Sequence, residues 1–577
     1  MRQIVLISGH ICVGKSSLAK SLEKRFGYHL IRSSGAIKEL KRERPSLGRL
    51  ELQDAGDELD RDSNHKWLLD FVIEQMKSVD PSRPVVVDNV RNSTQLRAFR
   101  EQHDFETIHV HLYANNEILE ARYAAKQGEN PKEKDIAYPD ADLIKNEDEI
   151  RYFQNDADVR IFTGRSDQED VLVRVAAHLG LYPPGDIRTV DVIVGGQYGS
   201  EGKGHVAGYL AREYDVLVRV GGPNAGHTVS SALGVITYHQ LPSGAEDTDA
   251  KLLLGPGMTI RVPALLKEIE LRKVTPERLF IDPQAMIIEQ EDIEEEQALV
   301  KGISSTGQGG GAAAARRIMG RNPDRRGSCL FGKTPPRVRL ARDVEELRPY
   351  VGEGPIYRGS TVARLEEAYR RGDSILLEGT QGSGLSLFHG LYPHVTSRDT
   401  NVAGCLAEAG ISPSRVRKIL MVVRYTPIRV ANSVNGNTSG LLKHEVTFEE
   451  VADQAGIDAN EVKESEKTST TRRDRRVGWF EWEQFRKACA LNAPTDIVLT
   501  FADYISAENR SARRFDQLPG KTIKFIEELE TVAQAPVSLV NIRFPREASE
   551  RFDLRTLIDR RNWTTQKRLK EAASFMR

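Results

Sequence analysis

The stretch Gly-Gly-Gln-Tyr-Gly-Ser-Glu-Gly-Lys-Gly-His, residues 195–205, decides how the middle of this chain folds. It follows an apolar run, residues 190–194, that predicts a buried strand, and it precedes residues 205–213, which predict a helix. Glycines let a backbone pass close to a ligand, and a helix N-terminus offers unpaired N–H groups to an anion. Together with the charge of Lys203, the stretch predicts a phosphate-binding loop.

A second phosphate-binding loop lies near the start of the chain. Residues 9–16 read Gly-His-Ile-Cys-Val-Gly-Lys-Ser and fit the pattern G-x-x-x-x-G-K-[ST]. The pattern follows a predicted strand and precedes a predicted helix, which is the context of a P-loop. In such a loop Lys15 reaches the β- and γ-phosphates, and Ser16 holds Mg²⁺. The predicted donor site consists of Gly9, Gly14, Lys15, Ser16 and Ser17.

The composition fits a soluble enzyme. The chain has 577 residues, of which 29% are charged and 39% apolar, and its net charge of −1 gives no reason to expect a nucleic-acid partner. The four cysteines show no C-x-x-C spacing, which excludes a zinc ribbon and a disulfide framework and fits a reducing compartment. No apolar run has the length of a membrane span. We therefore expect a cytoplasmic protein with small-molecule substrates and no membrane partner.

Two domains are predicted. Residues 181–186 read Leu-Tyr-Pro-Pro-Gly-Asp and end the helical pattern of residues 170–179. We expect one domain over residues 1–184 and another over residues 188–577. Both should be α/β. The first should have a parallel sheet with its site at the carboxyl ends of the strands, and the second a larger, mostly parallel sheet.

Four segments of the first domain lie downstream of the P-loop, at residues 29–34, 53–57, 88–92 and 120–123. Their order and spacing resemble a nucleoside monophosphate kinase, in particular the phage-type deoxynucleoside monophosphate kinases. The resemblance implies that Arg32 and Arg91 bind the acceptor phosphate, that Asp88 orients Mg²⁺ through water, and that Arg122 stabilises the transition state. Surface salt bridges are the alternative for Arg32 and Arg122.

Seven motifs follow in the second domain. They are GGQYGSEGKGH (195–205), GGPNAGHT (221–228), LGPGM (254–258), SSTGQG (304–309), LEGTQG (377–382), YPHVTS (392–397) and TTRRDRRVGW (470–479). In this order they resemble adenylosuccinate synthetase over nearly its full length. The resemblance implies a ligase that phosphorylates the 6-oxo group of a purine monophosphate. The amine of aspartate then displaces the phosphate at C6.

The same resemblance assigns roles to single residues. His227 would bond the phosphoryl group in flight, Lys203 would neutralise the donor phosphates, and the Gly226 carbonyl would face Mg²⁺. The implied catalytic residues are Ser200, Lys203, His227 and Gln381. The implied monophosphate site is Asn224, Thr306, Gln381, Thr396 and Arg473. The implied aspartate site is Thr470, Thr471, Arg473 and Arg475. The implied donor site is Gly202, Lys203, Gly204 and Asp503. The implied metal contacts are Ser200 and Gly226, in addition to Ser16, which the P-loop pattern predicts in the first domain.

The family also forms homodimers that lend an arginine to the partner's monophosphate site. We therefore expect a homodimer. Arg317 and Arg321 are both candidates for that arginine, and the sequence does not decide between them.

One position departs from the family. Its loop reads G-D-E-G-K-G, and that aspartate takes the N1 proton and binds Mg²⁺, whereas this chain has Ser200 there. A serine is not basic near neutral pH and is a poor ligand for Mg²⁺. Guanine carries a 2-amino group beside N1 where hypoxanthine has only C2–H, and serine leaves room for it. The substitution resembles the phage-type 2-aminoadenylosuccinate synthetase branch, which joins aspartate to dGMP.

The donor pocket departs as well. A segment that usually reads T-K-x-D, and selects guanine, reads Thr-Phe-Ala-Asp here, with Phe501 in place of the lysine. Residues 540–546 replace small residues of the same pocket. These changes make GTP doubtful, and we expect ATP or dATP as donor, with Mg²⁺.

The leading hypothesis is a bifunctional enzyme that makes N6-succino-2-amino-2′-deoxyadenylate from dGMP and also phosphorylates a deoxynucleoside monophosphate, for diaminopurine nucleotide synthesis. One alternative is an ordinary adenylosuccinate synthetase that uses IMP and GTP and is fused to a kinase. Another is a nucleotide sensor in which one catalytic domain is inactive.

Overall fold

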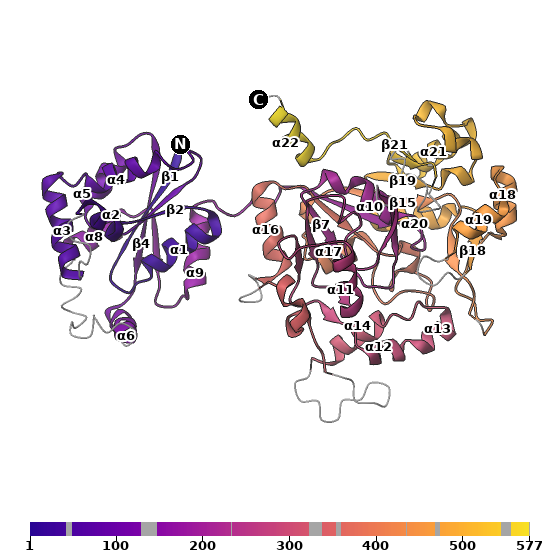
Figure 1. Ribbon diagram of the computed structural model, residues 1–577, viewed down its shortest axis with the longest axis horizontal. Coiled ribbons are helices and arrows are strands. Elements are labelled where there is room, and N and C mark those ends of the chain that lie inside the picture. Colours follow the sequence, from indigo (N-terminus) through magenta and orange to yellow (C-terminus); the bar gives the residue numbers. More distant parts are fainter. Residues whose placement is uncertain are drawn as a thin grey trace. The chain divides into compact units, whose positions relative to one another are not determined.

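The computed structural model describes residues 1–41, 49–127, 147–231, 234–321, 337–352, 359–433, 435–467, 474–543 and 556–575. The chain forms two compact units, Met1–Tyr182 and Pro183–Arg577 (Figure 1). Both units are α/β, as predicted from the sequence. Among the described helices, none is long and apolar enough to cross a membrane.

The first unit is built on a five-stranded parallel sheet in the order β2-β3-β1-β4-β5. The strands are β1 (Arg2–Gly9), β2 (His29–Arg32), β3 (Val85–Asp88), β4 (Phe105–Tyr113) and β5 (Val159–Phe162). Side chains of β1 alternate between two buried clusters, because successive residues of a strand point to opposite faces. Val5 and Ile7 pack on one side, and Ile4 and Leu6 on the other.

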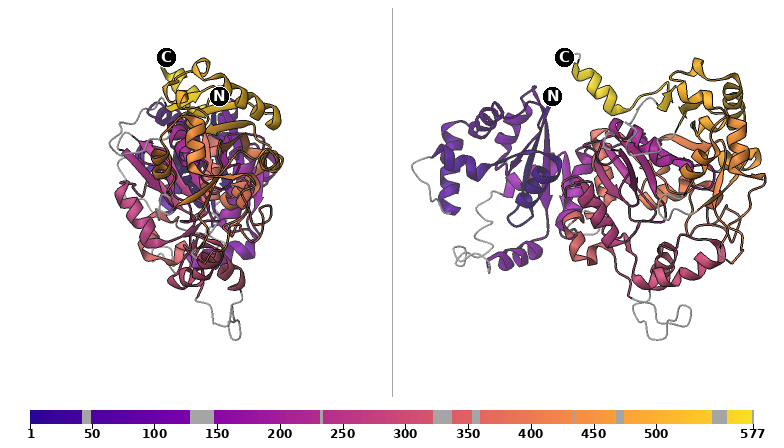
Figure 2. Two further views of the ribbon diagram at one scale, coloured as in Figure 1. Left: turned by 90° about the vertical axis from the view of Figure 1, so that its right-hand side faces the viewer. Right: turned by 45° about the vertical axis from the view of Figure 1, so that its right-hand side comes forward.

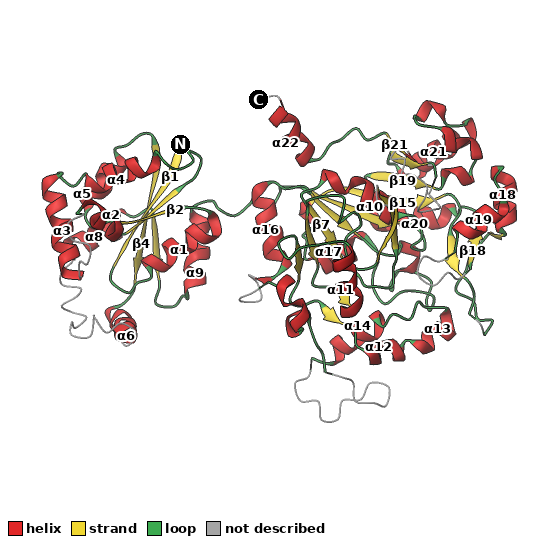
Figure 3. Cartoon of the chain, in the orientation of Figure 1, coloured by secondary structure: helices red, strands yellow, loops and turns green. Residues whose placement is uncertain are grey.

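Helices cover both faces of this sheet (Figure 3). The cluster that contains Val5 is closed by α1 (Lys15–Phe26), α6 (Asn116–Gln127) and α9 (Gln168–His178). The cluster that contains Ile4 is closed by α2 (Ser33–Leu40), α3 (Arg49–Asp62), α4 (Trp67–Met76), α5 (Ser93–Arg100) and α8 (Glu147–Asp156). Because all five strands are parallel, their carboxyl ends lie along the same edge of the sheet, and the P-loop follows the central strand β1 at this edge.

The second unit has a nine-stranded sheet in the order β12-β10-β7-β14-β6-β15-β19-β20-β21. It is parallel except for the last strand, which runs antiparallel to β20. The strands are β6 (Val190–Gly195), β7 (Val216–Arg219), β10 (Lys251–Leu254), β12 (Leu279–Ile281), β14 (Ile375–Glu378), β15 (Val416–Arg424), β19 (Asp496–Thr500), β20 (Val537–Asn541) and β21 (Leu557–Asp559). The carboxyl ends of β6, β14, β15 and β19 are neighbours, so the loops that follow these strands meet.

Helices lie on both faces of this sheet as well (Figure 2). One face packs against α16 (Thr361–Arg371), α17 (Val402–Ala409), α20 (Trp482–Asn492) and α21 (Gly520–Ala533). The other packs against α10 (Lys203–Leu210) and α11 (Val262–Leu271). The peripheral helices are α12 (Gln290–Glu295), α13 (Gln297–Ile303), α14 (Gly310–Met319), α18 (Phe448–Ala455), α19 (Ala459–Ser465) and α22 (Gln566–Phe575).

Three small sheets complete this unit. They are the hairpin β8 (His227–Ser231) with β9 (Gly234–Tyr238), the pair β11 (Thr259–Ile260) with β13 (Met286–Ile287), and β16 (Ile428–Val430) with β18 (Arg475–Gly478) and β17 (Glu445–Val446). The hairpin begins at the predicted catalytic histidine, and β18 begins at the predicted aspartate-binding arginine.

The helix after the glycine-rich loop begins at Lys203, earlier than the sequence predicted. Gly202 is its N-cap, in the left-handed conformation with φ 85°, and α10 gives way to a 3-10 turn at Ala211–Glu213. Glycine adopts this conformation without the strain that a side chain brings. Lys203 therefore occupies the first turn of the helix, beside its unpaired N–H groups.

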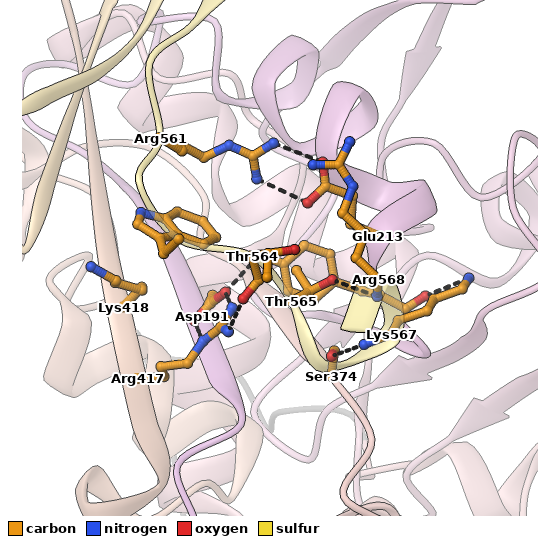
Figure 4. A network of polar contacts seen from close by, with 12 residues as sticks. Asp191, Glu213, Ser374, Arg417, Lys418, Arg561, Thr564, Thr565, Lys567 and Arg568 are labelled. Atoms are coloured by element: carbon orange, nitrogen blue, oxygen red, sulfur yellow. Dashed lines mark hydrogen bonds and ion pairs between the residues drawn. The ribbon is translucent and has the colours of Figure 1, made fainter. Parts of the chain in front are cut away.

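The C-terminal segment is fastened to the opposite edge of the sheet (Figure 4). Asp191, near the start of β6, is fully buried and forms an ion pair with Arg417 of β15. Arg417 Nη1 also donates to the Thr564 carbonyl at 2.7 Å. Arg561 binds Glu213 through two hydrogen bonds of 2.9 and 2.7 Å. This network holds the segment at the amino ends of the strands, away from the edge with the glycine-rich loop.

We expect Arg417→Ala to destabilise the second unit by about 3–5 kcal/mol, because it leaves the buried Asp191 carboxylate without its cation. Urea unfolding followed by tryptophan fluorescence measures this, since Trp479, Trp482 and Trp563 all lie in this unit. The control is Arg568→Ala. Arg568 pairs with Glu213 at 3.4 Å but is half exposed, so its loss should cost less than about 1 kcal/mol. Equal effects of the two substitutions would contradict the prediction.

Candidate active sites

The P-loop of the first unit connects β1 to α1. Gly9 has φ 140°, and a Cβ built on it would lie 2.2 Å from the Leu112 carbonyl oxygen, so only glycine fits. Gly14, with φ 106°, is the N-cap of α1. Lys15 Nζ donates to the carbonyls of Gly9 and His10 at 2.8 and 2.7 Å, which folds its ammonium group over the loop. The ammonium group is thus held beside the helix N-terminus, where phosphate binds.

A cavity of about 510 Å³ opens beside this loop, lined by the residues of the P-loop from Cys12 to Leu18 and by Arg122, Lys126 and Thr163, among others. Arg122 donates to the Thr163 hydroxyl at 2.9 Å and to the Thr163 carbonyl at 2.7 Å. The structure therefore places Arg122 in the wall of the cavity next to the P-loop. Its bonds are to a loop carbonyl and hydroxyl rather than to a surface carboxylate.

The acceptor candidates lie around the end of β3. Asp88 is buried and pairs in register with Ile7 of β1 and with Arg32 of β2. The Arg91 side chain lies against α3, and a Cβ built on Gly56 would be 2.2 Å from Arg91 Nη1. The segments that contain Asp88, Arg91 and Gly56 are therefore brought together, while Arg32 is exposed.

The glycine-rich loop of the second unit folds around its own carboxylate. Glu201 Oε1 accepts from the backbone N–H groups of Gln197 and Gly199 at 2.9 and 2.8 Å, and Glu201 Oε2 lies 2.6 Å from Lys203 Nζ. Both charged side chains are fully buried. Sequence reasoning missed Glu201, although an acid between two glycines of a phosphate loop was a usable signal.

Close packing explains why this loop has no hydroxyl after its lysine. A Cβ on Gly204 would lie 2.6 Å from the Cβ of His227. The first turn of α10 therefore packs directly against the start of β8. A serine or threonine, which a Walker sequence has at this position, does not fit. The same contact brings His227 next to Lys203.

His227 is held by a buried carboxylate. Its Nδ1 lies 2.5 Å from Glu378 Oε1, and Arg219 Nη1 lies 2.8 Å from Glu378 Oε2. Ser243 donates to Glu378 through its hydroxyl at 2.6 Å and its backbone N–H at 2.9 Å. Glu378 and Arg219 are the carboxyl-terminal residues of β14 and β7, and sequence reasoning missed both as site residues.

Burial and the charges around His227 favour its neutral form. Burial lowers the pKa of His227 to about 4, and the nearby charge of Arg219 acts in the same direction. Burial opposes ionisation of Glu378, yet Arg219 and His227 together hold the pKa of this carboxyl below its usual value. A neutral imidazole has one N–H: Nδ1–H would donate to Glu378, whereas a lone pair on Nδ1 would accept from Arg219 Nη1, which lies 2.6 Å away. Among the described residues, nothing bonds Nε2.

Two amide oxygens of the predicted monophosphate site have no partners in the described part of the chain, Oε1 of Gln381 and Oδ1 of Asn224. Gln381 has φ 60° and donates from Nε2 to the Thr396 hydroxyl at 2.9 Å. A Cβ on Gly199 would lie 2.9 Å from Gln381 Cα. The structure thus brings Gln381, Thr396 and the glycine-rich loop together. Thr306 is exposed on its own loop before α14.

The predicted aspartate site is described in part, since Thr470, Thr471 and Arg473 lie outside the described residues. Arg475 begins β18, and its Nη1 is 3.5 Å from Glu466 Oε2. Burial lowers the pKa of Arg475, against the charge of Glu466. Glu466 also binds Arg424, the last residue of β15, at 2.6 Å. Neither Glu466 nor Arg424 was predicted as a site residue.

The predicted donor-base pocket follows β19. Phe501 has φ 53°, and Asp503 is 2% exposed. Burial raises the pKa of Asp503 to about 6, although Arg510, 3.3 Å away, opposes this shift. Among the described residues, Asp503 Oδ1 has no hydrogen-bond partner. Val540 and Ile542, from the second segment predicted to line this pocket, are buried, and residues 544–546 lie outside the described parts.

The two candidates for a shared arginine differ in their surroundings. Arg317 Nη1 donates to the Gln284 carbonyl at 2.6 Å, and burial lowers the pKa of Arg317. Arg321 is exposed beyond the end of α14 and bonds only the carbonyl of Ile318, at 2.7 Å, within the described chain. The side chains of Ile318 and Met319 next to it are exposed as well.

Comparison with known proteins bears on both units. The family model described as adenylosuccinate synthetase matches residues 192–353 and 328–510, and one described as an AAA domain matches residues 5–153. The adenylosuccinate synthetase of Methanocaldococcus jannaschii is 34% identical over 362 residues, which cover 61% of this chain and 94% of that protein. That of Pyrococcus sp. is 34% identical over 357 residues, 60% of this chain and 94% of that protein.

A solved structure is similar over the same region. It is the succinoaminodeoxyadenylate synthetase of cyanophage S-2L, bound to dGMP and to dATP as energy donor. It is 28% identical, with a TM-score of 0.50, and the match covers 68% of this chain and 100% of that chain. The chain is therefore a C–N ligase that belongs to the adenylosuccinate synthetase family and carries a kinase-like P-loop unit at its N-terminal side.

Proposed function

We propose that the second unit joins L-aspartate to C6 of dGMP, which forms N6-succino-2-amino-2′-deoxyadenylate at the expense of ATP or dATP. The observation that carries the proposal is Ser200 in place of the family's acid. Its hydroxyl forms no hydrogen bond with any described residue and is half-buried in the loop beside Gln381. A free hydroxyl can accept from a 2-amino group. The similar cyanophage enzyme, which was solved with dGMP and dATP, supports the same substrates here.

In this proposal, the residues around the glycine-rich loop of the second unit have separate roles in the ligation. Lys203 exchanges part of its contact with Glu201 for the donor phosphates, which also meet the N–H groups of α10. His227 donates to the phosphoryl group from Nε2 when this nitrogen carries the proton, and Glu378 and Arg219 hold the ring through Nδ1. The unpartnered amide oxygens of Asn224 and Gln381 are acceptors for purine N–H groups. Arg475 binds an aspartate carboxylate.

Mg²⁺ fits both units as an ion bound largely through substrate phosphates. Among the described residues, no group of three or more His, Cys, Asp or Glu side chains forms a metal site, and Mg²⁺ in nucleotide sites takes few protein ligands. Ser16 and Asp88 would hold it in the first unit, and the Gly226 carbonyl in the second. When bound, the ion neutralises charge on the transferring phosphoryl group.

The donor of the ligase is proposed to be ATP or dATP. Phe501 has no charge with which to read the 6-oxo group of guanine. Asp503 offers an oxygen without a partner among the described residues, which can accept from the 6-amino group of adenine. We further propose a homodimer in which Arg321, exposed next to Ile318 and Met319, reaches the partner's monophosphate site.

The first unit is proposed to phosphorylate a (deoxy)nucleoside monophosphate. The P-loop, the cavity beside it and Arg122 in the cavity wall support a donor site. Arg91 against Gly56, close to the end of β3, supports an acceptor site on the other side of the P-loop. Such a kinase would serve the same pathway, because a modified purine monophosphate must become a triphosphate before a polymerase uses it.

A substrate panel tests the ligase proposal. The purified protein is incubated with L-aspartate, one of dGMP, GMP or IMP, and one of ATP, dATP or GTP, and the succinylated product is identified by mass spectrometry. We expect product from dGMP with ATP or dATP. Product from IMP with GTP, and none from dGMP, would support the ordinary adenylosuccinate synthetase instead. Ser200→Asp should move the ratio of turnover toward IMP by about tenfold or more, because it supplies a base for N1.

Glu378→Gln tests how His227 is positioned. The substitution removes the negative charge that balances Arg219 beside His227 and weakens the contact that orients the ring, so we expect kcat of the ligase to fall by about 10–100-fold. The KM for the purine monophosphate should change little, because Glu378 is buried behind the histidine. Ser243→Ala is the matched control. It removes one bond to Glu378 and keeps the carboxylate, so its effect should be much smaller.

Paired substitutions test whether both units are active. Lys15→Ala should abolish phosphorylation of deoxynucleoside monophosphates and leave aspartate ligation intact, and Lys203→Ala should do the reverse, since each lysine serves one phosphate loop. The first reaction is followed by ADP release without aspartate, and the second by product mass. If the parent protein lacks one of the two activities, the sensor alternative gains support. The same holds if one activity is unchanged by both substitutions.

A further inference from the structure

Arg424 lies between two parts of the proposed ligase site. It is the last residue of β15, which pairs with β6 on one side and β19 on the other. The loop with Ser200 follows β6, and the segment with Phe501 follows β19. The Arg424 side chain is 1% exposed, so its charge depends entirely on protein partners.

Its guanidinium group contacts three separate elements. Nη2 lies 2.6 Å from Glu466 Oε1, and Nη1 lies 3.3 Å from Glu466 Oε2. Nη1 also donates to the Ser200 carbonyl at 3.2 Å. The guanidinium carbon is 3.8 Å from the centre of the Phe501 ring, which is a cation–π contact. A planar fork makes all of these contacts at once, and an ammonium group does not.

The side with Phe501 lies in the predicted donor-base pocket. Thr500 donates its hydroxyl to the Glu201 carbonyl at 2.6 Å, which fastens this segment to the phosphate loop. A nucleotide with its phosphates on that loop therefore places its base over the ends of β15 and β19. Phe501 is half-buried, with its ring against Arg424 and 5.4 Å from the ring of Tyr504, and the buried Asp503 has an oxygen without a partner in the described chain.

The side with Glu466 carries an excess of positive charge. Glu466 serves two guanidinium groups, those of Arg424 and Arg475, and also accepts from the Tyr504 hydroxyl at 2.8 Å. Two cations around one carboxylate leave positive charge in a buried place beside Ser200. Buried charge of this kind favours an anionic ligand, and a forked guanidinium suits a carboxylate.

We propose that Arg424 is a positioning residue that couples binding of the donor base to binding of aspartate. A base stacked on Phe501 excludes water and strengthens the contact between the ring and the guanidinium. The fixed guanidinium holds Glu466, and Glu466 holds Arg475 in the orientation that binds a carboxylate. Because coupling between two ligands is reciprocal, aspartate also favours the donor. This inference rests on the ligase function proposed above.

Two substitutions in the donor pocket separate coupling from simple damage. Phe501→Leu removes the ring that contacts Arg424, and Asp503→Asn changes the pocket without touching Arg424. We expect both to raise the KM for ATP. We expect Phe501→Leu alone to raise the KM for aspartate as well, by about tenfold, while the KM for the purine monophosphate stays within about twofold of the parent value.

Arg424→Lys is the second test. It keeps the charge and loses the fork, so the KM values for donor and aspartate should rise together, and thermal melting should show that the variant is folded. Should it fail to fold, Phe501→Leu still decides. An unchanged KM for aspartate in Phe501→Leu, or an equal rise in Asp503→Asn, would overturn the proposal.

The experiments also distinguish failure of the proposed coupling from failure of the proposed ligase function. If the protein uses IMP instead of dGMP, the proposed function is wrong, and the same KM comparison is made with IMP. If no ligation occurs, calorimetric titration of Mg-ATP with and without L-aspartate measures the coupling directly. The parent protein should bind ATP about tenfold more tightly with aspartate present, and Phe501→Leu should lose this gain.

Discussion

The ligase site depends on the buried ion pair between Lys203 and Glu201. A lysine that is fully buried at a helix N-terminus needs a compensating charge, and Glu201 supplies it at 2.6 Å. The same carboxylate accepts from two backbone N–H groups of the loop and thereby sets the loop's shape. The pair therefore stores a positive charge for the donor phosphates without leaving it uncompensated in their absence.

The two predicted phosphate loops have related structures whose details follow from packing. In the first unit, Lys15 lies over loop carbonyls, and a serine follows it at the exposed start of α1. In the second unit, the hydroxyl position is a glycine because His227 packs against it. The space that a Walker loop uses for a hydroxyl ligand is used here to bring an imidazole next to the lysine. The kinase-like loop and the ligase loop thus differ at the residue after the lysine, which is a serine in the first and a glycine in the second.

The features that could be predicted from the sequence were those formed by consecutive residues. The glycine spacing and the apolar runs predicted both phosphate loops, their strands and the α/β class, because a strand, a loop and a helix are adjacent in sequence. The supporting residues were not predictable in this way. Glu378 supports His227 from 151 residues away, and Glu466 supports Arg424 from 42 residues away. Such contacts depend on which strand ends become neighbours, and the order of strands in a sheet cannot be predicted from the spacing of motifs along the sequence.

The balance of charged side chains at the ligase site favours an anionic ligand. At the carboxyl edge of the sheet, Lys203 is matched by Glu201 and Arg219 by Glu378, while Arg424 and Arg475 share Glu466. An acid at position 200 would bring this last group close to neutrality, because Arg424 already bonds the carbonyl of that residue. Serine leaves the positive charge in place. The substitution therefore does more than make room for a 2-amino group: it strengthens the demand for an anion between the loop and Arg475, where the aspartate of the proposed reaction must lie.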